Sequence, residues 1–181
     1  RLVTGASHAL HAQIARRELD IAICAAGSPD PSGTLTHPLI DDPYVLAVPK
    51  GTDVSGGLNA LGGLTFLRRD PDQVMGQQID RYITTAGLHL PHRFQMDSNQ
   101  SISALVAGGT GWTITTPLSL IRAGRFASAI DAHPLPGPAM ARRIVLYATG
   151  DWTGPIPDRI AERARELIED HFAAPARARM P

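Results

Sequence analysis

The sequence predicts an α/β fold, because strand-like and helix-like stretches alternate along the chain. LDIAICAA (19–26), LTFLRR (64–69) and RRIVLYAT (142–149) are apolar runs of strand length. The stretches between them carry apolar residues at helical spacing. Such alternation implies parallel βαβ units, which bind ligands at the carboxyl ends of their strands, next to helix N-termini.

The expected elements are placed by periodicity and by the turn residues that bound them. We expect strands at 19–26, 44–48, 64–69, 92–96, 112–116 and 142–149. We expect helices at 8–17, 71–86, 98–108, 117–124 and from about 157 to 172. The continuous apolar character of 19–26 indicates burial on both faces of that strand. Gly87 and Gly124 each follow a helix, where a residue with positive φ ends it.

The last helix has a regular apolar face and a proline near its start. Pro157 stands at an early position, which the missing N–H of proline tolerates. The apolar residues follow at spacings of four, three, one and four: Ile160, Ala164, Leu167, Ile168 and Phe172. This spacing predicts an amphipathic helix packed on the sheet.

The glycine-rich stretch SISALVAGGTGWTITTP (101–117) resembles a phosphate-binding loop only superficially. Such a loop runs from strand through glycines to helix, so that the helix N-terminus faces the anion. Here Ile102, Leu105 and Val106 indicate a helix before the glycines, and WTITT predicts a strand after them. The glycines therefore end a helix, and any ligand should lie near Ser98, at the other end of it.

The composition is that of an ordinary globular protein. Of the residues, 43% are hydrophobic, and 17 basic residues balance 17 acidic ones, so bulk charge gives no case for nucleic-acid binding by this chain. Apolar runs are far shorter than a membrane span, and we expect no membrane association. The single cysteine, Cys24, excludes an internal disulfide and fits a reducing cytoplasm; it is expected at the end of a buried strand.

Other candidate sites are weaker. His8 and His11, like His89 and His92, are three residues apart, but neither pair has the third and fourth ligands that a metal requires, so we expect no metal or other cofactor. The adjacent acids at 41–42 are expected in a solvated turn. No nucleophile has an assignable base, and no nucleophile elbow or dinucleotide-binding glycine pattern occurs, so we do not expect an enzyme.

Three stretches in order resemble the effector-binding domain of LysR-type transcriptional regulators. These are ARRELDIAI (15–23), PLIDDPYVLAVPKG (38–51) and SISALVAGGTGWTITTP (101–117). The resemblance implies the two-lobed type 2 periplasmic-binding-protein fold, with a ligand cleft between the lobes and crossovers at 47–51 and 147–151.

The resemblance also implies a domain organisation. Lobe I would hold 1–49 and 150–172, lobe II would hold 50–149, and 173–181 would be a flexible tail. The first strand and helix of lobe I are expected to be missing, as is the DNA-binding helix-turn-helix that family members carry before this domain. The chain is thus expected to be a fragment of a longer protein.

The function implied by the resemblance is sensing of a small-molecule effector. A homodimer or higher homo-oligomer is implied, acting in the cytoplasm and touching DNA only through the N-terminal domain. The alternative is a periplasmic solute-binding protein of a transporter, and a third reading is an enzyme on the same fold. An upstream helix-turn-helix, a signal peptide or turnover of a bound ligand would distinguish these three.

Two groups of polar residues are candidates for ligand binding. Ser98, Asn99 and Ser101 open a helix whose N-terminal N–H groups suit an anion, although capping of that helix alone also explains Ser98 or Asn99. Arg68 and Arg69 end a strand, and one guanidinium could clamp a carboxylate. The alternative is a solvated pair with Asp70 and Asp72 as local partners.

The adjacent threonines after the glycines form the third candidate. Thr115 and Thr116 end a strand, as the two arginines do. Because neighbouring strand residues point to opposite faces, we expect one arginine and one threonine to face the cleft. A small organic anion is the expected ligand class.

Overall fold

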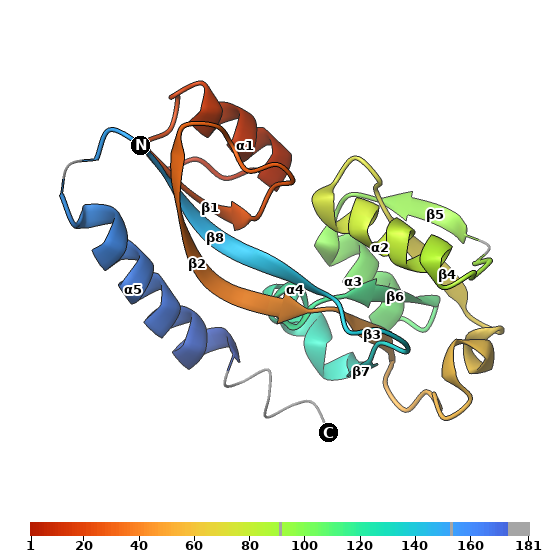
Figure 1. Ribbon diagram of the computed structural model, residues 1–181. Coiled ribbons are helices and arrows are strands. Elements are labelled where there is room, and N and C mark those ends of the chain that lie inside the picture. Colours follow the sequence, from red (N-terminus) through yellow and green to blue (C-terminus); the bar gives the residue numbers. More distant parts are fainter. Residues whose placement is uncertain (91, 153, 174–181) are drawn as a thin grey trace. The chain divides into compact units, whose positions relative to one another are not determined.

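The computed structural model describes residues 1–90, 92–152 and 154–173 (Figure 1). The chain forms two compact units, and the tail expected at 173–181 lies almost wholly outside the described residues. Unit 1 contains Arg1–Asp42 and Arg142–His171, and unit 2 contains Pro43–Ala141. The chain thus changes unit earlier than at the expected positions 49 and 150, because the strand after Asp42 pairs within unit 2.

Unit 1 is a three-stranded sheet with a helix on each face. The strands lie in the order β1 (Ile21–Ala25), β8 (Ala141–Thr149), β2 (Thr34–Pro43), and β1 runs antiparallel to β8. Helix α1 (Ser7–Ala15) packs Leu10 and Ile14 against Cys24, Val145 and Tyr147. Helix α5 (Ile156–Ile168) packs on the other face, and a short π-helical turn, Glu169–Ala173, follows it.

Two expectations for unit 1 were wrong in part. Strand β1 is not buried on both faces, because Ile23 is 46% exposed. The expected apolar face of α5 was wrong in part: Ala161, which was not expected on it, is fully buried, whereas Ile160 and Leu167 are 37% and 38% exposed. With Ile23 and Ile156 these two residues line an open apolar depression of about 620 Å³.

The acids at 41–42 do not lie in a solvated turn, so that expectation was wrong. They belong to β2, a strand that the sequence did not predict because its prolines and acids have low strand propensity. Asp42 is only 1% exposed, and its Oδ2 lies 2.8 Å from Nη2 of Arg142. Asp41 pairs with Arg143 at the surface, at 3.1 Å. Two arginines of β8 thus make strand structure possible here.

Unit 2 contains a mixed five-stranded sheet. The order is β5 (His92–Met96), β4 (Thr65–Arg69), β6 (Gly111–Thr115), β3 (Val45–Pro49), β7 (Ile130–Pro134). Strand β4 is parallel to β5 and β6, whereas β3 is antiparallel to β6 and β7. Parallel βαβ pairing therefore holds only for β4, β5 and β6, and β7 was not predicted.

Helices cover both faces of this sheet. Helix α2 (Val74–Thr85) lies on one face and α3 (Asn99–Ala107) on the other, followed by α4 (Pro117–Arg122). Short 3-10 turns occupy Gly57–Leu61 and Gly124–Ala129. Each face has its own core: Phe66, Trp112 and Ile114 pack with α2, whereas Leu67 and Ala47 pack with α3.

The glycines after α3 have the role that the sequence indicated. Gly108 is the C-cap of α3, and Gly109 has a φ of 77°. Gly111 then opens β6, where a Cβ atom would lie 2.1 Å from the carbonyl oxygen of Thr65. The glycines end a helix and allow two strands to approach closely, so the phosphate-loop interpretation is excluded on structural grounds.

Candidate functional site

The two arginines at the end of β4 have different surroundings. Arg68 lies on the α2 face and donates to Asp80 through Nε at 3.1 Å and Nη2 at 2.7 Å. This hydrogen-bonded pairing raises the pKa of Arg68. The expected local partners Asp70 and Asp72 are not the ones it uses. Both hydrogen-bonding sides of the Arg68 guanidinium that these contacts use are therefore directed to Asp80 on the α2 face.

Arg69 lies on the opposite face and is 5% exposed. Its Nη2 donates to Oδ1 of Asn99 at 2.9 Å, and its Nη1 lies 3.4 Å from Oε1 of Gln73. Gln73 in turn donates through Nε2 to the carbonyl oxygen of Asp97 at 3.0 Å. The buried guanidinium is thereby held beside the N-terminus of α3.

Asn99 extends this network to the end of β6. Its Nδ2 donates to the carbonyl oxygen of Ser119 at 2.7 Å. The Ser119 hydroxyl lies 3.1 Å from Oγ1 of Thr116, which caps α4 by accepting from the N–H of Ser119. We call Arg69, Gln73, Asn99, Thr116 and Ser119 the carboxyl-edge cluster, because it joins the carboxyl ends of β4 and β6.

Ser98 and Ser101 flank the cluster at the first turn of α3. Ser98 is the N-cap, and its Oγ accepts from the N–H of Ser101 at 3.2 Å. The expectation that Ser98 caps this helix is confirmed. The first N–H groups of a helix have no partner within it, and the Ser101 N–H is used by the cap, so the N–H groups of Asn99 and Gln100 are the ones that suit an anion beside the exposed Ser101.

The two threonines are both buried, at 1% for Thr115 and 0% for Thr116. Thr116 belongs to the carboxyl-edge cluster, where its side chain caps α4. Thr115 pairs with Val45 of β3, and its hydroxyl has no hydrogen-bond partner among the described residues. Thr113, two residues earlier, donates to the carbonyl oxygen of Leu67 at 2.9 Å. Thr115 therefore holds a desolvated hydroxyl on the same sheet face as Arg69.

The histidine pairs show no metal site. No group of three or more potential ligand side chains comes together within the ranges the structure describes. His11 instead hydrogen-bonds through Nε2 to the carbonyl oxygen of Ala25 at 2.8 Å and packs edge-on against Tyr147. The side chain of His92 lies outside the described part.

Cys24 and Tyr147 lie together in the core of unit 1. Burial raises the pKa of the Cys24 thiol to about 11, and Asp30 adds to the effect. Burial also raises the pKa of Tyr147, whose hydroxyl donates to Asp30 and accepts from the N–H of Gly27 at 3.0 Å. Cys24 is thus a protonated core residue, as expected for the end of a buried strand.

Sequence reasoning missed Gln73 and Ser119, the two residues that bridge the cluster. Ser119 could have been found, since a threonine followed by proline and, three positions on, by serine is a helix-capping pattern. No local sequence pattern distinguishes Gln73, because its role depends on α2 beginning beside the loop that precedes α3.

Comparisons with known proteins agree with this architecture. The model of the family described as "LysR substrate binding domain" matches residues 1–156. The chain belongs to the LysR substrate binding domain family. No curated protein matches the chain in sequence.

Several solved structures share the fold. A mutant of OxyR from Corynebacterium glutamicum has a TM-score of 0.78 at 19% identity, covering 99% of this chain and 57% of that one. The regulatory domain of CcmR from Synechocystis PCC6803, in complex with 2-PG, has a TM-score of 0.76 at 16% identity, covering 94% and 84%. The effector-binding domain of QuiR, in complex with shikimate, has a TM-score of 0.70 at 16% identity, covering 93% and 80%.

These matches confirm the predicted family and the type 2 periplasmic-binding-protein fold. The chain spans little more than half of the OxyR chain, at 57%. Among the helices of the described ranges, none combines the length and the apolar character needed to cross a bilayer.

Proposed function

We propose that this chain is the effector-sensing domain of a LysR-type transcriptional regulator and that a small organic anion binds at the carboxyl-edge cluster. The network from Arg69 through Asn99 to Ser119 carries the proposal. It places a buried guanidinium next to the N-terminus of a nine-residue helix. Both features favour negative charge, and both lie where α/β sheets bind ligands.

The donors around this position suit a carboxylate. The Asn99 side chain uses its oxygen for Arg69 and its amide group for Ser119, so its orientation is fixed. The ligand would instead receive hydrogen bonds from the N–H groups of Asn99 and Gln100, which open α3, and from the hydroxyls of Ser98 and Ser101. Arg69, held in place by Asn99 and Gln73, would supply the positive charge. Thr115 would offer its buried hydroxyl.

The relatives support the class of function. QuiR and CcmR were both determined with a small molecule bound, shikimate and 2-PG respectively. The family favours a regulator over the solute-binding protein of a transporter, and it comprises effector-binding domains rather than enzymes.

For the whole protein we propose a cytoplasmic homodimer or higher oligomer that reaches DNA through an N-terminal domain. The effector can shift the arrangement of the DNA-binding domains only if it binds one arrangement more tightly than another. Sedimentation of the full-length regulator with and without effector would test the assembly.

Thermal unfolding against a panel of small carboxylates and neutral metabolites tests the site. A ligand at 100 times its Kd adds about 2.7 kcal/mol of stability, which corresponds to several degrees for a chain of this size. We expect Arg69→Gln and Ser101→Ala to reduce the ligand-induced shift. Arg68→Gln, on the adjacent residue of the same strand, should lower the melting temperature and leave the shift unchanged.

Two results would contradict the proposal. One is the same loss of ligand-induced shift in Arg68→Gln as in Arg69→Gln. The other is stabilisation by neutral metabolites alone, since the cluster would then not select an anion. Ser101 is exposed, so its substitution tests the site without disturbing the core.

A further inference from the structure

Unit 2 contains a cavity on the α2 face of its sheet, and thus on the face opposite the carboxyl-edge cluster. It has a volume of about 340 Å³, within the range of small-molecule sites. Its walls come from three segments: Tyr44 at the start of unit 2, the second half of α2, and the loop from Pro138 to Ala141. All the lining residues belong to unit 2.

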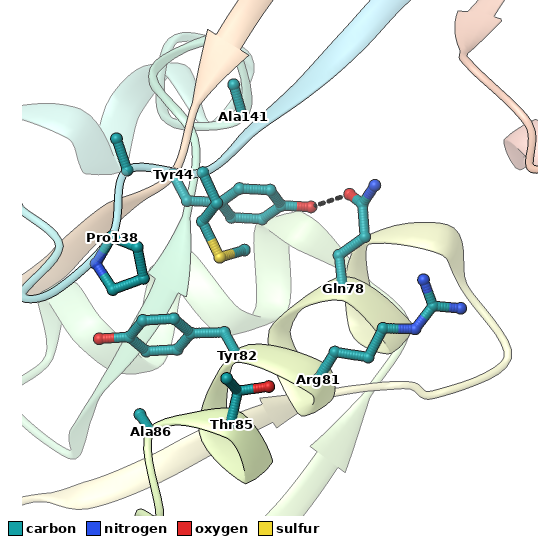
Figure 2. A pocket seen from close by; sticks show the side chains of 10 residues that line it. Tyr44, Gln78, Arg81, Tyr82, Thr85, Ala86, Pro138 and Ala141 are labelled. Atoms are coloured by element: carbon teal, nitrogen blue, oxygen red, sulfur yellow. Dashed lines mark hydrogen bonds between the residues drawn. The ribbon is translucent and has the colours of Figure 1, made fainter.

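Two tyrosine rings form opposite sides of this cavity, as Figure 2 shows. The Tyr44 hydroxyl donates to Oε1 of Gln78 at 2.5 Å, and the Tyr82 hydroxyl donates to the carbonyl oxygen of Pro136 at 2.5 Å. The hydroxyls point in opposite directions, and both rings are more than nine-tenths buried. Pro138 and Met140 complete an apolar lining. Such a lining suits a flat apolar group, which gains by stacking on aromatic rings.

The walls are held in place before any ligand binds. The Tyr44 N–H donates to the carbonyl oxygen of Met140 at 2.9 Å. The loop before Met140 contains Pro136 and Pro138, whose fixed φ limits its conformations. Burial raises the pKa of Tyr82, so its hydroxyl keeps the proton that binds this loop. A preformed pocket loses little entropy on binding.

The charge at the rim has one sign. Arg81 is exposed at the edge of the cavity, and the lining includes no acidic side chain. The neighbouring acid on α2, Asp80, is already paired with Arg68. Arg81 itself forms no ion pair with any residue in the described ranges. Its guanidinium can therefore receive the anionic group of a ligand whose apolar part enters the cavity.

We propose that this cavity is a second ligand site, specific for a small aromatic or apolar monocarboxylate. The ring of the ligand packs between Tyr44, Tyr82 and Met140, and the carboxylate faces Arg81. The site is independent of the carboxyl-edge cluster, since no residue is common to both. Its lining includes Tyr44 and Ala141, which lie next to the two positions where the chain passes into unit 1.

An NMR titration of the chain with sodium benzoate, at constant ionic strength, tests this site. We expect saturable shifts of the backbone amides of Thr85, Ala86 and Ala139. Benzamide is a neutral molecule of similar shape and cannot form an ion pair with Arg81. It should therefore bind about fivefold more weakly than benzoate, which is the effect of losing one exposed ion pair. Arg81→Gln should lower the benzoate affinity to that of benzamide, whereas Arg122→Gln, an exposed arginine on α4, should change nothing.

A blocking variant gives an independent test. Thr85 is exposed at the rim, so Thr85→Trp should fill the entrance without disturbing the core, and it should abolish the saturable shifts. Shifts confined to Ser98–Ser101 would overturn this inference and leave the proposed function intact. Equal affinity for benzoate and benzamide, or unchanged binding in both Thr85→Trp and Arg81→Gln, would also overturn it.

Discussion

Removing the charge of Asp42 should strongly destabilise unit 1, because Asp42 forms a buried ion pair with Arg142, and Asp42→Asn tests this. Arg142 approaches Oδ2 of Asp42 through Nε at 2.9 Å and Nη2 at 2.8 Å. The side chains are 1% and 18% exposed for the aspartate and the arginine. Substitution by asparagine keeps the shape and removes the charge, so the guanidinium stays largely buried without its counter-charge.

The expected cost lies near the lower end of the range for breaking a buried pair. Loss of one partner of such a pair costs about 3–5 kcal/mol, and the partial exposure of Arg142 reduces this to about 3 kcal/mol. For a chain of this size that corresponds to a fall in Tm of about 6–12 °C. Differential scanning calorimetry at neutral pH measures the change in Tm, and urea unfolding measures the change in the free energy of unfolding.

The adjacent residues provide a matched control. Asp41 and Arg143 form the same kind of pair one position away, but their side chains are 62% and 60% exposed. We expect Asp41→Asn to cost less than about 1 kcal/mol, because water screens the exposed pair. A fall in Tm for Asp42→Asn no larger than that for Asp41→Asn would refute the argument from burial. A double-mutant cycle with Arg142→Gln isolates the pairwise energy.

Three further predictions concern single buried groups. Cys24 should not react with a thiol reagent at pH 8 until the protein unfolds. Its folded pKa of about 11 exceeds the ordinary value of 9.0. The stability that the protonated thiol contributes should therefore be present below pH 9 and fall as the pH rises through 11. Gly76→Ala should destabilise by about 1–3 kcal/mol in chemical denaturation, since its Cβ would lie 2.0 Å from the carbonyl oxygen of Asp70, while Gly63→Ala, with open space around it, should not. Thr115→Val should be neutral or stabilising by up to about 1 kcal/mol, because its hydroxyl has no described partner, and an accompanying loss of ligand affinity would place that hydroxyl in the ligand site.

Several local features that depend on neighbours in the chain were predicted correctly. The helix that ends at the glycines, its Ser98 cap and the positive φ of Gly87 and Gly124 are all present. Arg68 and Arg69 were also correctly expected to point to opposite faces of the sheet, since side chains alternate along a strand. Which of them meets α3 could not be derived, because that depends on the order of the strands.

The errors have a common origin. Strand β2 was missed because its acids and prolines look like a turn until β8 supplies Arg142 and Arg143. Ile23 was expected to be buried because its neighbours are apolar, yet it lies in the open depression beside α5 and is 46% exposed. In both cases a partner distant in sequence decides the outcome.

The sequence by itself determined the α/β class, the family, most helices and strands, and the polar residues at their ends. These follow from periodicity, capping and turn residues, which act over a few positions. The tertiary structure alone decided that Arg69, Asn99 and Ser119 form one network, and that Tyr44 and Tyr82 enclose a cavity with Arg81 at its rim. Those contacts join segments brought together by the sheet order β4–β6–β3 and by the packing of α2, and no local pattern encodes either.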